Sequence, residues 1–222
     1  MNDPADPATA DGHPGPDDAP GLRRRLRRAV LLVALLNLGY FFVEIGVALA
    51  IGSVSLFADS VDFLEDTAVN LLIFLALGWS LRARSRAGKA MALIICVPAI
   101  AAGVQAILKA FAPTAPDPLS LGVTAGGALV VNLACSLILA RFRHEGGSMT
   151  TAAFLAARND VLVNAAIIVM GLITAATASG WPDIVLGVLI IALNLTAAKE
   201  VWEAATEEQL AAKALAGDFD DD

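Results

Sequence analysis

The sequence predicts an all-α integral membrane protein, folded as a bundle of six transmembrane helices. Three observations lead to this prediction. The 222 residues are 57% hydrophobic with a mean hydropathy of +0.70, whereas soluble domains are roughly 45–50% apolar. Six apolar segments are long enough to cross a bilayer core, which takes about 20 helical residues. The connections between them are short and rich in Gly, Pro or basic residues, as turns require.

The composition divides the chain into three parts. Residues 1–28 join an acidic tail, which carries too little apolar area to pack and is predicted to be disordered, to a basic anchor at 23–28. The six-helix transmembrane domain covers 29–205, and 206–222 form a short acidic cytoplasmic tail. The first apolar run is too long for a signal peptide, and further spans follow it. The predicted spans are 29–50, 55–79, 90–112, 119–141, 150–177 and 182–202.

Lysine and arginine residues predict how the helices are oriented. Thirteen of the fifteen fall on one side: before the first span, between the second and third, where the fourth ends and the fifth has not begun, or at the end of the chain. Lys109 lies near the opposite face, and Arg158 lies within a span. The positive-inside rule therefore places both termini in the cytoplasm, and a bacterial-type inner membrane is the expected location. Because the basic clusters are short and the net charge is −7, we expect no nucleic-acid partner.

Four acidic residues interrupt the second apolar span: Asp59, Asp62, Glu65 and Asp66. Asp66 lies roughly 17 Å from the start of the span, near the midplane of the membrane. Asp62 and Asp66 are four residues apart and share one helix face, with Asp59 a turn away on the same stripe and Glu65 pointing partly aside. A charge at this depth costs several kcal/mol, so it normally faces the bundle interior and serves a function. Two carboxylates on one face repel unless a cation or protons lie between them.

The fifth span supplies a partner for this pair. Asp160 lies roughly 15 Å from the cytoplasmic start of the span, again near the midplane. The pattern Asp-x-x-Val-Asn occurs at 66–70 and again at 160–164, in spans that run in opposite directions. Asn37 and Asn132 lie 29 and 28 residues before the first residue of each pattern. We therefore predict a three-plus-three inverted repeat, with an ion site where the two repeats meet.

Asp62, Asp66 and Asp160 are expected to converge on one divalent cation. Oxygen ligands favour Mn²⁺, Fe²⁺ or Mg²⁺, although carboxylates also bind Zn²⁺ at about 2.0–2.2 Å. The ion is expected to be a transported substrate rather than a cofactor, and the protein is not expected to be an enzyme. The candidates for a further ligand or a supporting role are Asp59, Asn159 and Asn164.

These motifs resemble the cation diffusion facilitator family. The resemblance covers about residues 29–205 and rests on NLGYFFVE at 37–44, GSVSLFADSVDFLED at 52–66 and RNDVLVN at 158–164. It implies a homodimer in the lipid bilayer that exports a divalent transition metal from the cytoplasm, driven by proton influx. We accordingly expect proton antiport with alternating access, with Zn²⁺ as the first candidate substrate and Co²⁺, Cd²⁺, Fe²⁺ or Mn²⁺ as the others.

The resemblance also implies the metal ligands. In that family, one His-or-Asp-x-x-x-Asp pair in span two and a similar pair in span five hold the ion. Asp62 and Asp66 match the first pair, and Asp160 matches the end of the second, but the start of the second pair is Ala156, which cannot bind metal. The family usually carries a cytoplasmic metal-binding domain after span six, which has no counterpart in this sequence, and the loop between spans four and five has a single histidine, His144.

Other interpretations remain open. A non-transporting metal sensor or scaffold fits Ala156 and the missing domain. An intramembrane aspartyl protease also pairs acids from two helices, but the sequence has no Gly-x-Gly-Asp. A passive Mg²⁺-type channel is disfavoured because three buried carboxylates hold an ion too tightly for fast conduction. Glu44 either lines an outward path, shares a proton with Asp59 or makes a plain interhelical hydrogen bond, and Arg158 either snorkels to the membrane rim or balances charge near the site.

Overall fold

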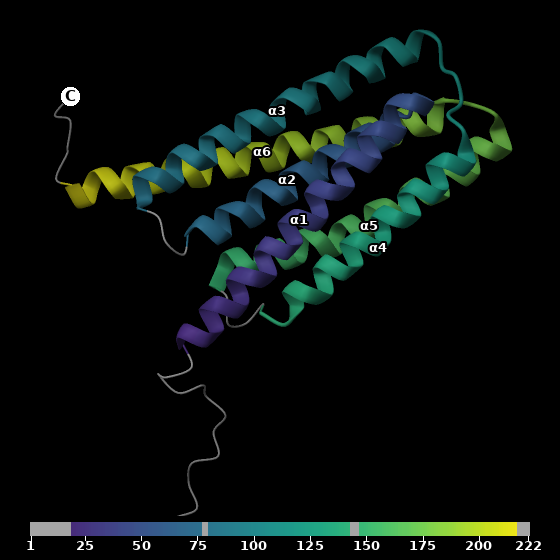
Figure 1. Ribbon diagram of the computed structural model, residues 1–222. Coiled ribbons are helices and arrows are strands. Elements are labelled where there is room, and N and C mark those ends of the chain that lie inside the picture. The colour runs from purple at the N-terminus through teal and green to yellow at the C-terminus, as the bar shows by residue number, and fades with distance from the viewer. Residues whose placement is uncertain (1–18, 77–79, 143–146, 217–222) are drawn as a thin grey trace, which may run out of the picture.

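The computed structural model describes residues 19–76, 80–142 and 147–216, in which six helices follow one another and no strand occurs. Successive helices run in alternating directions, so α1 begins and α6 ends at the same end of the bundle (Figure 1). The all-α prediction is confirmed, and each predicted span overlaps one helix. The helices are α1 (Ala19–Ile51), α2 (Val54–Ala76), α3 (Leu81–Phe111), α4 (Pro118–Ala140), α5 (Gly147–Thr177) and α6 (Trp181–Ala216).

Three helices are substantially longer than the spans predicted for them. One is α3, which begins at Leu81 rather than at residue 90, so the basic connection before the predicted span is helical. The first helix begins at Ala19, so the basic anchor at 23–28 is helical and continuous with the apolar run. The last continues to Ala216, so much of the segment predicted as an acidic tail is also helical. The remainder of both tails, together with His144, lies outside the described residues.

Helix α2 occupies the middle of the bundle. It contacts α1, α3, α5 and α6, while α4 packs against α5 and α1, and α3 packs mainly along α6 (Figure 1). The acidic residues of α2 are therefore enclosed by other helices rather than presented to the surroundings.

The distribution of polarity is the reverse of that in a soluble protein. Asparagine and acidic side chains are buried, while large apolar side chains cover the outside of the helices. In a membrane, lipid solvates the apolar exterior and polar groups turn inward. The protein is thus a multi-pass integral membrane protein. The exposed apolar residues include Leu35, Phe42, Val97, Ile107, Val123, Leu137, Leu172 and Leu189.

Three helical segments of the described chain are long and apolar enough to cross a membrane on their own: Gly21–Ile51, Pro118–Ala140 and Ala153–Thr177. Shorter apolar segments occupy Cys96–Phe111 and Trp181–Thr196. Helix α2 falls short of this standard because its four acids interrupt every apolar stretch of that length. The predicted count of six spans therefore stays a prediction.

A tight turn brings α2 back against α1. Gly52 has a φ of +64°, which glycine adopts without the steric penalty of a Cβ. The N–H of Ser53 donates to the carbonyl of Ala48 at 3.0 Å, which completes a Schellman-type end to α1. The turn sets the start of α2 and hence the depth of the acids that follow.

The start of α6 is fastened to this turn by one carboxylate. Asp183 accepts hydrogen bonds from the hydroxyls of Ser53 and Ser55, both at 2.6 Å, and from the N–H of Val54 at 2.8 Å. It also forms an ion pair with Lys109 at 2.9 Å, and its side chain is fully buried. We call these residues, Asp183, Lys109, Ser53, Val54 and Ser55, the Asp183 anchor. The anchor ties together the start of α2, the end of α3 and the start of α6.

Candidate metal-binding site

A cavity of about 340 Å³ lies between α2, α5 and α6. Asp62 and Asp66 line it from α2, and Asp160 lines it from α5. The spacing of four residues places the first two on one helix face, and the contact between α2 and α5 sets the third opposite them. The structure therefore brings all three predicted acids to the same cavity.

The three carboxylates do not form a closed coordination shell. Within the described ranges, no three His, Cys, Asp or Glu side chains are placed to hold one metal ion together. They share a cavity wide enough for water as well as an ion, and Asp62 is partly exposed to it. Their assignment as metal ligands stays a prediction.

Asp66 is positioned by α1 and α4. The Nδ2 of Asn37 donates a hydrogen bond to Asp66 Oδ2 at 3.2 Å. The thiol of Cys135 in turn donates to Asn37 Oδ1 at 3.6 Å, and all three residues are buried. Asn37 is thus held from behind and orients the carboxylate on α2.

The two Asp-x-x-Val-Asn patterns adopt the same local arrangement. Asn70 Nδ2 donates to the carbonyl of Asp66 at 2.9 Å, and Asn164 Nδ2 donates to the carbonyl of Asp160 at 2.8 Å. The Oδ1 atoms of both asparagines are buried and have no hydrogen-bond partner among the described residues. This shared geometry is what the predicted inverted repeat requires, although by itself it covers only one turn of each helix.

Of the three candidates for a further ligand, one lines the cavity and two do not. Asn159 lines the cavity. Asp59 is fully buried away from it, and Asn164 is turned toward the backbone of its own helix. Arg158 is exposed and donates a hydrogen bond to Asn159 Oδ1 at 3.5 Å, so its positive charge lies beside the cavity.

Residues outside the predicted set also line the cavity. Glu65 does so, although its helical angle suggested that it pointed partly aside. Asn194 and Thr196 approach from α6, which the sequence did not connect to the site. Asn194 donates from Nδ2 to the carbonyl of Ala58 at 2.8 Å, and its buried Oδ1 has no partner within the described residues. The sequence feature that could have pointed to α6 is Asn194 itself, a single asparagine within the apolar run of the sixth span.

A second pair of acids lies nearer the turn between α1 and α2. Glu44 and Asp59 are both fully buried and lie within interaction distance of each other. In the described part of the chain, no hydrogen-bond donor contacts either carboxylate. A plain hydrogen bond between the two would therefore require a proton on one of them.

A comparison with known families identifies the family of the chain. Residues 30–207 match the family described as the cation efflux transmembrane domain. The matched region runs from α1 into α6 and includes all the described residues that line the cavity. No curated protein sequence matches the chain.

Proposed function

The chain belongs to the cation efflux family and is a metal cation transporter, and we propose that it exports a divalent transition metal ion from the cytoplasm. Zn²⁺ is the first candidate substrate, and Co²⁺, Cd²⁺, Fe²⁺ and Mn²⁺ are the alternatives. The proposal includes six membrane spans with both termini in the cytoplasm. It also includes the homodimer that the resemblance implies.

The observation that carries the proposal is the shared cavity. Asp62 and Asp66 from α2 and Asp160 from α5 face one space inside an apolar bundle. Three carboxylates in such surroundings repel one another and need positive charge between them. A divalent cation supplies it, and Asn159 offers an amide oxygen where Ala156 offers no ligand.

The proposed mechanism is alternating access around this cavity. Metal and protons compete for the same carboxylate oxygens, so metal binding releases protons, and protons arriving from outside displace the metal. The cavity is open enough that the three carboxylates do not yet converge, so ion capture would draw α2 and α5 together. Glu44 and Asp59 lie toward the opposite end of the bundle from the chain termini, where the outward path would run.

The orientation is supported by where the basic residues gather. Arg82, Arg86 and Lys89 at the start of α3 and Lys213 near the end of α6 line one pocket. This end of the bundle also holds the start of α1, with its five arginines at 23–28. Positive residues mark the cytoplasmic side of a membrane protein.

The test is metal flux into proteoliposomes under an imposed pH gradient. Wild type is compared with Asp66→Asn and Asp160→Asn, and with Asp117→Asn as a matched control for loss of an acid outside the cavity. We expect proton-dependent flux that falls by at least about 10-fold in the two cavity variants, because each replaces an ion-binding carboxylate by a neutral amide. The control should match wild type.

Two results would overturn the proposal. Flux that survives Asp160→Asn would mean that the ion passes elsewhere. Absence of flux for every metal, with metal binding retained, would favour the non-transporting sensor or scaffold.

A further inference from the structure

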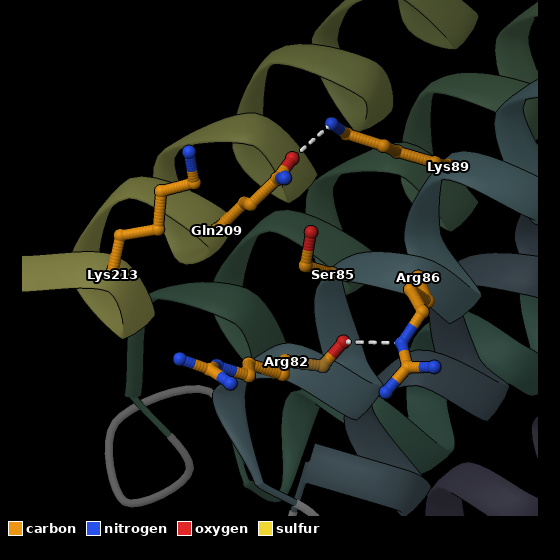
Figure 2. A pocket seen from close by; sticks show the side chains of 6 residues that line it. All are labelled: Arg82, Ser85, Arg86, Lys89, Gln209 and Lys213. Carbon is orange, nitrogen blue, oxygen red and sulfur yellow. Dashed lines mark hydrogen bonds between the residues drawn. The ribbon is translucent and has the colours of Figure 1, made fainter. Parts of the chain in front are cut away.

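A second cavity, of about 410 Å³, lies between the start of α3 and the last turns of α6. Figure 2 shows its six lining side chains, of which four are cationic. None of the described residues that line it is acidic. Ser85 lies between the residues of α6 and the two arginines of α3. The lining residues are Arg82, Ser85, Arg86, Lys89, Gln209 and Lys213.

Within the described residues, two of these cations, Arg86 and Lys89, have no acidic partner. Arg86 donates from Nε to the backbone carbonyl of Arg82 at 3.4 Å. Lys89 donates to the side-chain carbonyl of Gln209 and lies 5.4 Å from the ring centroid of Trp202 (Figure 2). A carbonyl, an amide and a ring orient a cation without neutralising it. Positive charges gathered in one cavity repel one another, so a bound anion would stabilise the arrangement.

The two helices that line the cavity are closely packed next to it in the sequence of α3. A Cβ on Gly88 would lie 2.8 Å from the Cβ of Ala205, so the two helices touch at this point. Ser85, one turn toward the start of α3, is buried. The opening beyond this contact is therefore built by the two helices themselves.

An apolar surface adjoins the cationic one. Lys89, Leu93 and Val97 are spaced four residues apart and so lie along one face of α3. Leu93 and Val97 are 58% and 69% exposed. A ligand with a phosphate head and an acyl tail would place its head in the cavity and its tail along this face. A free phosphate would use only the first part.

We propose that this cavity binds the phosphate group of an anionic phospholipid at the cytoplasmic surface of the membrane. Basic pockets between transmembrane helices on that side suit such headgroups, and guanidinium groups match phosphate oxygens in geometry as well as charge. The site shares no lining residue with the cavity between α2, α5 and α6. It goes beyond the proposed transport activity and rests only on the membrane orientation proposed with it.

The chain provides its own reporter for the test. Replacing Trp79 and Trp181 by Phe leaves Trp202, beside Lys89, as the single tryptophan. The full-length protein is placed in phosphatidylcholine nanodiscs with increasing fractions of acyl-brominated phosphatidylglycerol or, separately, acyl-brominated phosphatidylcholine. Quenching of Trp202 then compares the two lipids at the cavity.

We expect brominated phosphatidylglycerol to quench Trp202 at mole fractions at least about tenfold lower than brominated phosphatidylcholine does. The triple variant Arg82→Gln, Arg86→Gln, Lys213→Gln should remove this preference, because it removes three of the four positive charges that line the cavity. Lys89 is unchanged, so its contact with the reporter Trp202 is kept. The matched control neutralises the three consecutive arginines at 23–25, which precede the cavity-forming helices, and should retain the preference. Arg82→Glu serves as a single change at an exposed residue and should weaken it.

Three results would overturn the proposal. Equal quenching by both lipids in wild type would remove the selective site. Equal loss in the triple variant and in the control would show a general effect of surface charge. A Trp202 emission change on adding inorganic phosphate to phosphatidylcholine discs, absent in the triple variant and without lipid preference, would assign the cavity to a soluble anion instead.

Discussion

Asp183 and Asp66 are both buried carboxylates in an apolar bundle, yet their surroundings differ. Asp183 accepts hydrogen bonds from two serine hydroxyls and two backbone N–H groups, and it pairs with Lys109. Asp66 accepts a hydrogen bond from Asn37 and faces a cavity that it shares with Asp160. The first carboxylate has donors around both oxygens, whereas the second lies where an incoming ion can reach it.

The difference separates structural acids from candidate transport acids. A buried charge is tolerated when a counter-ion and hydrogen bonds compensate it, and the Asp183 anchor supplies both within the chain. Within the described residues, no ion pair links Asp62, Asp66 or Asp160 to a cation of the chain, so a mobile cation or protons would compensate these three carboxylates. The number of hydrogen bonds and counter-ions around a buried carboxylate, rather than its burial, therefore indicates which acids to test for transport.

The largest effect on folding is expected from breaking the anchor. Asp183→Ala leaves Lys109 buried without its counter-ion and removes the acceptor of Ser53 and Ser55. We expect a loss of about 3–5 kcal/mol in unfolding free energy, measured by denaturant titration in detergent micelles. The double variant with Lys109→Met should recover part of this loss. In contrast, Asp66→Asn should leave the unfolding free energy nearly unchanged, because the side-chain amide oxygen of the new residue can still accept the hydrogen bond from Asn37.

A result with the opposite order would contradict the comparison. If Asp66→Asn destabilised the protein more than Asp183→Ala did, the cavity acids would be holding the fold together. The distinction between the two regions would then fail.

A smaller effect is expected where α6 crosses α2 beside the anchor. A Cβ on Gly187 would lie 2.8 Å from the carbonyl carbon of Val54 and 2.9 Å from the N of Ser55. Backbone atoms cannot move aside as a flexible side chain does, so Gly187→Ala should cost about 1–3 kcal/mol in unfolding free energy. Gly122→Ala is the matched control, because a Cβ there meets no atom within 4 Å. It should be neutral or stabilising, since Ala favours helix over Gly, and equal loss in both variants would refute the close contact.

The third prediction adds a ligand to the cavity. Ala156 lines it one turn from Asp160, at the position where the resemblance implies a histidine or aspartate. Ala156→His places an imidazole there, which suits Zn²⁺ better than Mn²⁺. We expect the ratio of Zn²⁺ to Mn²⁺ affinity to rise about tenfold, equivalent to about 1.4 kcal/mol, as measured by calorimetry. The matched control is Leu155→His on the exposed side of α5, and a similar rise there would indicate binding outside the cavity.

The sequence predicted the six helices and the main acids because both depend on local periodicity. A spacing of four residues is enough to put Asp62 and Asp66 on one face, whatever packs against it. Asp59 lies on nearly the same stripe, but it does not reach the cavity. Asn194 of α6 bonds to the carbonyl of Ala58 and packs α6 against α2 next to this residue. Whether Asp59 reaches the cavity therefore depends on a helix far along the chain, which the local spacing does not reveal.

The Asp183 anchor shows the same limit more clearly. Lys109 stood out in the sequence only as an exception to the distribution of basic residues. Its partner lies 74 residues away, and nothing in the local pattern of either residue connects them. Contacts of this kind follow from how helices are arranged in space, and the order of the six spans does not specify that arrangement.

The smallest effect is expected for a solvent-exposed acid, Asp117, which extends the comparison beyond the two buried acids. Asp117 precedes α4 and accepts from the N–H of Ser120 at 2.7 Å as an N-cap. Hydrogen bonds from the Ser120 side chain and backbone hold the pKa of Asp117 below its ordinary value. A carboxyl with a lowered pKa contributes stability above its unfolded pKa, about 3.9, and that contribution is lost as the pH falls through the folded pKa.

Asp117→Ala should therefore lower the unfolding midpoint slightly at pH 7, because it removes the cap. The difference from wild type should shrink as the pH falls below about 4 and on through the lowered pKa of Asp117, because the carboxyl of the wild type becomes protonated. Asp117→Asn keeps a capping oxygen that does not titrate, so its midpoint should lie close to wild type at pH 7 and exceed it at pH 3. Thermal unfolding at the two pH values measures both differences. A gap between Asp117→Ala and wild type that is the same at both would show that the charge of Asp117 contributes nothing, and that solvent satisfies this acid as fully as the anchor satisfies Asp183.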